Sequence, residues 1–218
     1  MKKTFLAFLV LLIATISCKK SSSPAETAQN YMDLTSGTTR QYQTTNNLTA
    51  VVTTNTITST NRDSTINSKS YHVFSNNNGA GNEYYNITGN DYYTFRSLGA
   101  ALGNLTVESV YLKANAAVNA SWNEIVNLPF AGVPGGTVPV TLTYIIAEKG
   151  ISRTVNSIAY TNVIRVTTTI AVTGLPPGSV TTDIQSYYAP KAGLIESKNK
   201  IVVPLLTTNV DQNTILLQ

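Results

Sequence analysis

The chain has 218 residues, of which 42% are hydrophobic and only 12% charged, and its formal net charge is +4 at pH 7. This length is enough for one domain with a sizeable core. The basic residues are scattered and form no stripe with aromatic side chains, which speaks against nucleic acid as a partner. One cysteine allows no disulfide within the chain. Abundant Thr, Asn, Ser and Tyr are typical of an extracytoplasmic β protein.

Residues 1–17 have the pattern of an export signal. Lys2 and Lys3 give a positive start, residues 5–14 are apolar, and Cys18 follows a small residue. The apolar run is shorter than the roughly 20 residues that a membrane-spanning helix needs. The arrangement resembles a bacterial lipoprotein signal, with Thr15 at a position where Leu is usual. The resemblance implies that Cys18 is acylated and becomes the first residue of the mature protein. An ordinary secreted protein with a cysteine near its cleavage site is the alternative.

The remainder divides into a tether and one domain. Residues 18–29 are expected to be the lipidated cysteine and a flexible tether, and residues 30–218 a single antiparallel β domain. Lys19 and Lys20 can contact anionic lipid headgroups. The residues after Cys18 do not resemble the acidic signal that sends some bacterial lipoproteins to the cell surface. We therefore expect an outer-membrane lipoprotein of the cell envelope that faces the periplasm more than the cell surface.

Strand patterns recur along the whole domain, whereas helix patterns are weak. Runs rich in β-branched and aromatic residues predict strands at 50–58, 70–75, 84–87, 91–95, 107–112, 121–128, 140–147, 158–172, 184–188, 193–198 and 200–206. Residues 129–139 contain three glycines and are expected to form a loop, and residues 98–102 are compatible with a short helix. The pattern predicts an all-β, mainly antiparallel fold of about nine to eleven strands. A strongly curved single sheet, either a half-barrel or an open barrel, fits it.

Three stretches of the domain resemble a broad group of uncharacterised lipoproteins from Bacteroidota. Residues 31–37 are similar to their opening Y-x-P-L-x-x-G phrase, with Asp33 in place of the usual proline. Residues 160–166 are similar to a Y-x-D/N-V-I-x-V strand, and residues 186–195 to a strand-turn-strand segment near the end of these proteins. The resemblance implies a half-barrel similar to the lipoprotein carriers LolA and LppX, and it brings no catalytic residues. On physical grounds, Pro190 and Gly193 predict a structural corner in the third stretch.

Support for catalysis is weak. A Ser-His-Asp arrangement would have to use His72, the only histidine, with Asp63 or Asp91 as the orienting acid, and no Gly-x-Ser-x-Gly elbow accompanies it. We therefore expect His72 to be a strand residue and the protein not to be an enzyme. One histidine and an acylated cysteine cannot form a zinc site, and no metal or cofactor is expected. The five acids that could be paired for glycoside hydrolysis are far apart in sequence and are predicted to be surface residues: Glu83, Asp91, Glu108, Glu124 and Glu148. Residues 76–83 lack the order of a calcium loop and are predicted to be a polar turn.

Two further features concern the surface. Asp63-Ser64-Thr65 resembles the O-glycosylation sequon of exported Bacteroidota proteins, which makes Ser64 a candidate site on an exposed loop at residues 62–66. A chance match is the alternative. Tyrosine pairs at residues 84–85, 92–93 and 187–188 should place one ring in the core and one on the surface, because neighbouring strand residues point to opposite faces.

The sequence favours a membrane-anchored, non-catalytic protein whose curved sheet shelters a lipid or another apolar ligand, with its ligand-binding residues unknown. The alternative is a structural or interaction module of the cell envelope that contacts protein or glycan. An enzyme would require acids or His72 to converge in a cleft.

Overall fold

The computed structural model describes residues 29–79, 81–97, 105–129, 136–203 and 208–217, and these form one antiparallel sheet of twelve strands. The strands are β1 (Thr39–Asn46), β2 (Val51–Ile66), β3 (Lys69–Asn76), β4 (Glu83–Thr88), β5 (Asp91–Ser97), β6 (Thr106–Lys113), β7 (Ser121–Pro129), β8 (Thr137–Val155), β9 (Ile158–Val172), β10 (Thr181–Ala189), β11 (Gly193–Val203) and β12 (Thr208–Leu216). None of the described residues belongs to a helix with the length and hydropathy that a membrane crossing needs. Cys18 and the predicted helix at 98–102 lie outside the described residues.

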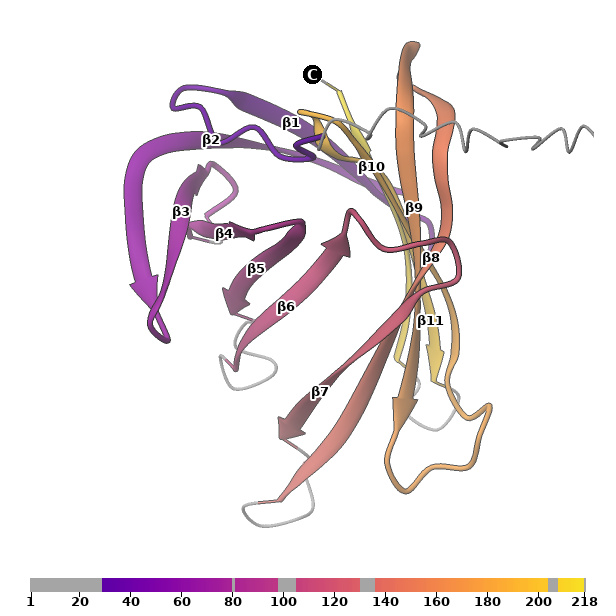
Figure 1. The fold of residues 1–218 in the computed structure, drawn as a ribbon. Coiled ribbons are helices and arrows are strands. Elements are labelled where there is room, and N and C mark those ends of the chain that lie inside the picture. The colour runs from indigo at the N-terminus through magenta and orange to yellow at the C-terminus, as the bar shows by residue number, and fades with distance from the viewer. Residues whose placement is uncertain (1–28, 80, 98–104, 130–135, 204–207, 218) are drawn as a thin grey trace, which may run out of the picture.

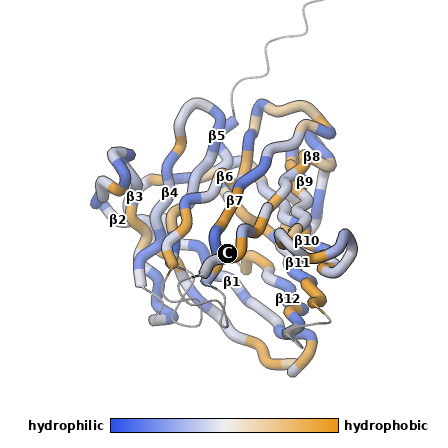
Figure 2. The backbone as a smooth tube through the Cα atoms, turned by 90° about the horizontal axis from the view of Figure 1, so that it is seen from below, coloured by the Kyte–Doolittle hydropathy of each residue, from blue (hydrophilic) through white to orange (hydrophobic). Residues whose placement is uncertain are grey.

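The strands follow one another as an up-and-down meander that returns on itself. Strand β1 pairs with both β2 and β12, and the order across the sheet runs from β6 through β1 and β12 to β7. Neighbours in chain order are therefore neighbours in the sheet, except that β6 and β7 are its two edges. Figure 1 shows the sheet wrapping round so that these two edges face each other, and Figure 2 shows the strands following a ring. The predicted curved single sheet is confirmed as a nearly closed barrel, with one strand more than the upper estimate.

Curvature comes from irregular pairing at several places. The register shifts between Ser59 and Asp63 in β2 against β3, between Tyr187 and Tyr188 in β10, and three times between β8 and β9. Extra residues in one strand of an antiparallel pair increase its twist and bend it. Such bends allow strands as long as β8 and β9 to wrap round the molecule.

The predicted strands differ from the observed ones mainly at their ends. Strand β9 has the expected bounds, whereas β2 and β8 are longer than expected and the loop expected at 129–139 is entered by both β7 and β8. The two strands expected at 193–198 and 200–206 are one strand, β11, through Val203. Strands β1 and β12 were not predicted. Residues 62–66 are the end of β2 and not a loop, because they pair with β3.

The core fills one end of the barrel, here called the closed end. It contains buried side chains from nearly every strand together with Tyr31 and Met32, which precede β1. The connection at 114–120 and the turn at 190–192 lie at this end too, since Ala114 bonds Asn90 and Lys191 bonds Asn30. The opposite end, at which β7, β9 and β11 finish, is called the open end.

Candidate functional site

Inward side chains toward the open end form an aliphatic wall on β7, β8 and β9. Alternation along the strands identifies the inner face, because Trp122 and Tyr144 pack on the core whereas Ile125, one residue out of phase, is 68% exposed. From Trp122 toward the open end, cross-strand pairing aligns inward side chains of the three strands in two successive rows. The first row is Glu124, Leu142 and Ile170, and the second is Val126, Val140 and Val172. All but Val140 are only partly buried. The wall therefore offers apolar surface that the core does not fully cover.

The opposite inner wall, on β1 and β12, is polar. Thr44 and Thr214 face each other in register, and their hydroxyl oxygens are 2.9 Å apart. The next inward pair toward the open end is Asn46 with Gln212. The open half of the barrel thus has one wall that is aliphatic apart from Glu124, and opposite it a strip of hydroxyl and amide groups that is followed by Val210 toward the open end. This arrangement suits an amphipathic molecule.

Tyrosine rings form the floor between this half and the closed end. Tyr111 is in edge or tilted contact with Tyr85, Tyr92 and Tyr188, at centroid distances of 6.1, 6.1 and 5.4 Å. Burial raises the pKa of Tyr188 to about 12 and holds the pKa values of Tyr85 and Tyr111 well above their ordinary value. These rings consequently stay neutral at physiological pH.

Among the outward rings of the three tyrosine pairs, Tyr187 differs from the expectation. Tyr85, Tyr92 and Tyr188 are the inward rings, as alternation requires. Tyr187, however, is also buried, because the Arg153 guanidinium lies 3.7 Å from its ring centroid and forms a two-bond pair with Glu196. Its predicted exposure is wrong, since the outer face of β8 to β11 carries ion pairs that cover it.

Arg40 joins two of the three stretches on which the resemblance rests. It is buried, and its guanidinium donates to the carbonyl oxygens of Asp33, Lys191 and Ala192. The remaining stretch, residues 160–166, is held by the Tyr31 hydroxyl, which donates to the carbonyl of Asn162 at 2.8 Å. These segments meet at the closed end, and the corner predicted at Pro190 and Gly193 is a turn between β10 and β11.

The structure brings His72 together with a serine and an acid. Its Nε2 lies 2.8 Å from the Ser59 hydroxyl oxygen, and its Nδ1 lies 2.9 Å from an Asp63 carboxylate oxygen. Asp63, one of the two acids considered from sequence, is therefore the partner. Asp91 is not, because it pairs with Lys113. Ser59 was missed, because only the bulge between Ser59 and Asp63 places both residues against one imidazole.

This chain of contacts lacks the features of an acyl-transfer site. Ser59 is 1% exposed, and its hydroxyl donates to the carbonyl oxygen of Leu34. Its backbone N–H donates to Thr38, and the neighbouring Gly37 N–H donates to Ser59, so neither is free to stabilise an oxyanion. The arrangement fastens the segment that follows the tether to β2 and β3.

Side chains bridge the line along which the two sheet edges, β6 and β7, face each other, here called the seam. Trp122 donates its indole N–H to the carbonyl of Val110 at 2.8 Å, and the Glu124 carboxylate accepts the N–H of the same residue. The Tyr144 ring stacks on the Trp122 ring with 5.4 Å between the ring centroids, and the Tyr144 hydroxyl donates to the Glu124 carboxylate. The backbone N–H and carbonyl of Val110 on β6 therefore both have partners on β7, although no backbone ladder joins the two strands.

The acids singled out from the sequence do not form a carboxylate pair. Their partners are different side chains in each case: Asn76 and Tyr85 for Glu83, Lys113 for Asp91, Lys69 for Glu108, Tyr144 for Glu124 and Arg165 for Glu148. Within the described ranges, no cluster of three or more His, Cys, Asp or Glu side chains could hold a metal ion.

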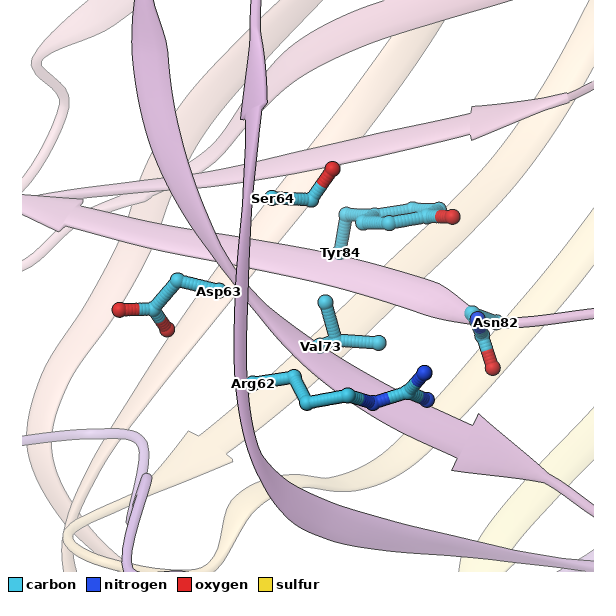
Figure 3. Close-up of a pocket in the computed structure, with 6 residues that line it drawn as sticks. All are labelled: Arg62, Asp63, Ser64, Val73, Asn82 and Tyr84. Carbon is cyan, nitrogen blue, oxygen red and sulfur yellow. The ribbon is translucent and has the colours of Figure 1, made fainter.

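Ser64 lies at a small pocket of about 210 Å³ on the outer face, beside Arg62, Val73, Asn82 and Tyr84. Figure 3 shows the Asp63 carboxylate pointing away from Ser64 and Tyr84, as its contact with His72 on the inner face requires. Ser64 is half-buried in a paired strand. Its glycosylation stays a prediction.

No family model and no curated protein matches this chain in sequence. Among solved structures, a candidate lipoprotein from Parabacteroides distasonis has a TM-score of 0.52 and 11% identity, over 88% of this chain and 99% of that chain. A candidate exported protein with a YmcC-like fold from Bacteroides fragilis has a TM-score of 0.47 and 10% identity, over the same shares. At such identities, the likeness to the first structure establishes the fold alone.

Proposed function

We propose that this protein is a non-catalytic lipoprotein of the cell envelope that holds an amphipathic lipid or another apolar small molecule in the open half of its barrel. The observation that carries the proposal is the partly exposed aliphatic wall formed by Leu142, Ile170 and their neighbours, on the inner face of the sheet. Apolar surface left uncovered inside a concave fold is stabilised by an apolar ligand, at roughly 25 cal/mol per Å² buried.

The polar wall sets the class of ligand. Thr44, Asn46 and Gln212 supply hydroxyl and amide groups opposite the aliphatic rows, and they carry no charge. A ligand with an acyl chain on one side and uncharged hydrogen-bonding groups on the other fits both walls. The tyrosine floor limits how far such a chain can reach toward the closed end.

The lipoprotein part of the proposal rests on the sequence. Cys18 follows an apolar run of signal length, and the structurally similar Parabacteroides protein is itself described as a candidate lipoprotein. A periplasm-facing location in the outer membrane, with the membrane as a partner through the acyl anchor, is the corresponding localisation. The buried Ser59 supports the non-catalytic part.

A pair of variants tests ligand binding. Leu142→Gln places an amide on the aliphatic wall, and Ile125→Gln makes the same change on the outer face of the neighbouring strand. Titration of the fluorescent fatty-acid analogue cis-parinaric acid should give at least several-fold weaker binding for the first variant and unchanged binding for the second. Absence of binding to the unsubstituted protein, or equal effects of the two variants, would overturn the proposal.

An envelope interaction module is the second candidate. It is favoured by the edges of β6 and β7, each of which pairs with a strand on one side only in the described structure. Unpaired edges can accept a strand from a partner protein. A stable protein complex isolated from the envelope, together with no bound small molecule, would favour this function.

A further inference from the structure

The pocket beside Ser64, here called the outer pocket, lies on the outer face of the sheet and not inside the barrel. Five of its six lining residues are polar, and Val73 is the exception. Val73 and Tyr84 point outward, because their chain neighbours Phe74 and Tyr85 pack in the core. Val73 is only 4% exposed, so it forms a closed apolar floor. The outer pocket is therefore a small polar site, separate from the apolar site proposed above.

An irregular segment of β2 supplies the cation of the outer pocket. Residues 60–62 lie within the register shift of β2 against β3. The Thr60 hydroxyl accepts the backbone N–H of Arg62 at 3.2 Å and donates to the Val73 carbonyl at 2.6 Å, which fixes this segment on β3. Bulges of this kind change the direction in which side chains point. Here the bulge turns Asp63 to the inner face and leaves Arg62 on the outer face, next to Val73 (Figure 3).

The Arg62 guanidinium has no acidic partner in the part of the chain that the structure describes. It takes part in none of the ion pairs there, and the acid that follows it, Asp63, points away from the outer pocket. Arg153, by contrast, is paired with Glu196. A guanidinium presents a planar fork of N–H donors that fits a carboxylate or a phosphate through two bonds. The outer pocket can thus bind an anionic group at Arg62.

An aromatic ring and an amide complete the lining. Figure 3 shows the Arg62 and Tyr84 side chains on opposite sides of the outer pocket, with Asn82 at the end toward which both point. The Tyr84 ring is in edge contact with Phe95, with 6.3 Å between the ring centroids, which holds the ring in place. A tyrosine ring offers an apolar face, and amide and hydroxyl groups offer hydrogen bonds. Such a lining fits a hydroxylated ring better than an acyl chain.

We propose that the outer pocket binds an acidic monosaccharide unit, such as a uronic acid at the end of a glycan. Arg62 holds the carboxylate, Asn82 and Ser64 bond the hydroxyls, and the C–H face of the sugar ring packs on Tyr84. The volume of about 210 Å³ suits a single sugar unit, whereas drug-sized ligands occupy about 300 to 1,000 Å³. A neutral sugar would leave Arg62 unpaired, so charge sets the specificity. The site is independent of the ligand inside the barrel.

Saturation-transfer NMR on the acylated mature protein in detergent micelles tests the site. The probe is D-glucuronate, and the reference sugar is D-glucose, which carries a hydroxymethyl group in place of the carboxylate. Arg62→Gln removes the cation from the outer pocket, and Tyr84→Leu removes the ring. Arg96→Gln is the matched control. Arg96 is likewise exposed and forms no ion pair within the described ranges, but it lies on the inner face, since its neighbour Phe95 pairs with the outward Tyr84.

The proposal predicts saturation transfer to glucuronate that falls several-fold in Arg62→Gln and in Tyr84→Leu and is unchanged in Arg96→Gln. Glucose should receive several-fold less transfer than glucuronate. Absence of transfer to glucuronate, equal losses in the two arginine variants, or equal transfer to glucose would overturn the proposal. Inorganic phosphate that displaces glucuronate at equal concentration would reject a sugar as the ligand. An intact mass that shows a sugar on Ser64 would also overturn it, because the outer pocket would then hold the protein's own glycan.

Discussion

Trp122 donates its indole N–H to the carbonyl oxygen of Val110, 2.8 Å away, across the one place where neighbouring strands of this meander do not pair. Glu124 accepts the N–H of the same residue. Two side chains of β7 thus take over the hydrogen bonds that a backbone ladder would supply. The seam is closed at this point, while the sheet keeps two edges.

The seam bond should contribute measurably to stability. Trp122→Phe keeps a ring against Tyr144 but leaves the Val110 carbonyl without its donor, so we expect a loss of about 1 to 3 kcal/mol in the free energy of unfolding. Urea denaturation followed by circular dichroism measures it. Ile125→Val, on the outer face of the same strand, should change stability by about 0.5 kcal/mol or less. If both variants were equally stable, the seam would have no energetic role.

Gly193 should tolerate alanine less well than other glycines with positive φ. Its φ is +75°, and an added Cβ would lie 3.2 Å from the Met32 sulfur and 3.5 Å from the Tyr31 carbonyl oxygen. Gly174 has a φ of +87° with nothing within 4 Å. We expect Gly174→Ala to cost about 1 kcal/mol from backbone strain alone, and Gly193→Ala distinctly more. Thermal unfolding of both variants compares them, and equal losses would argue against close packing at the closed end.

Ser59 should stabilise the fold by linking Leu34 to His72, and it should not act as a nucleophile. A fluorophosphonate probe is expected to leave the folded protein unlabelled, because the hydroxyl is buried under Leu34. Ser59→Ala should lower the free energy of unfolding by about 1 to 3 kcal/mol, since it removes the hydroxyl that the Leu34 carbonyl and the His72 Nε2 contact. Ser64→Ala is the control. Labelling that disappears in Ser59→Ala would instead identify an enzyme.

The tyrosine floor should make stability fall at high pH. Burial raises the pKa of Tyr188 to about 12 from an ordinary value of 10.0. Between these values the unfolded chain loses the proton that the folded protein retains, so stability is full below pH 10 and falls toward pH 12. This one residue accounts for about 3 kcal/mol. Denaturant titrations across this range, with tyrosinate absorbance, measure the slope, which Tyr188→Phe should reduce. Ionisation of every tyrosine near pH 10 without loss of stability would contradict the buried floor.

The sequence predicts the fold class well because most strands are rich in the β-branched and aromatic residues that strands favour. Residues 158–172 are mostly β-branched or aromatic and include no glycine or proline, and β9 has those bounds. Strands β1 and β12 escape prediction because Thr, Gln and Asn dominate them, and they are strands only through pairing with each other and with β2 and β11. Lys198, Asn199 and Lys200 look like a turn, yet they continue β11 because their backbone pairs with β10 on one side and β12 on the other. Asp183 and Asp211 pair with the two lysines.

The candidate site depends on contacts that no local pattern encodes. The approach of Ser59 to His72 needs an irregular segment of β2, whose position follows from the bend of the sheet. The seam contact of Trp122 with Val110 exists only because the meander closes. The aliphatic wall is different, since alternation along 121–128 and 140–147 already separates an apolar from a polar face. Its inward direction is set by the closure of the barrel.

The proposed function requires that the open half of the barrel holds an apolar ligand. Native mass spectrometry of the mature protein, purified gently from its own membrane with lipid extraction alongside, tests this most directly. We predict one reproducible adduct beyond the acyl groups on Cys18, released into the organic phase and reduced in Leu142→Gln. A clean mass for the unsubstituted protein, with no lipid or apolar metabolite in the extract, would contradict it.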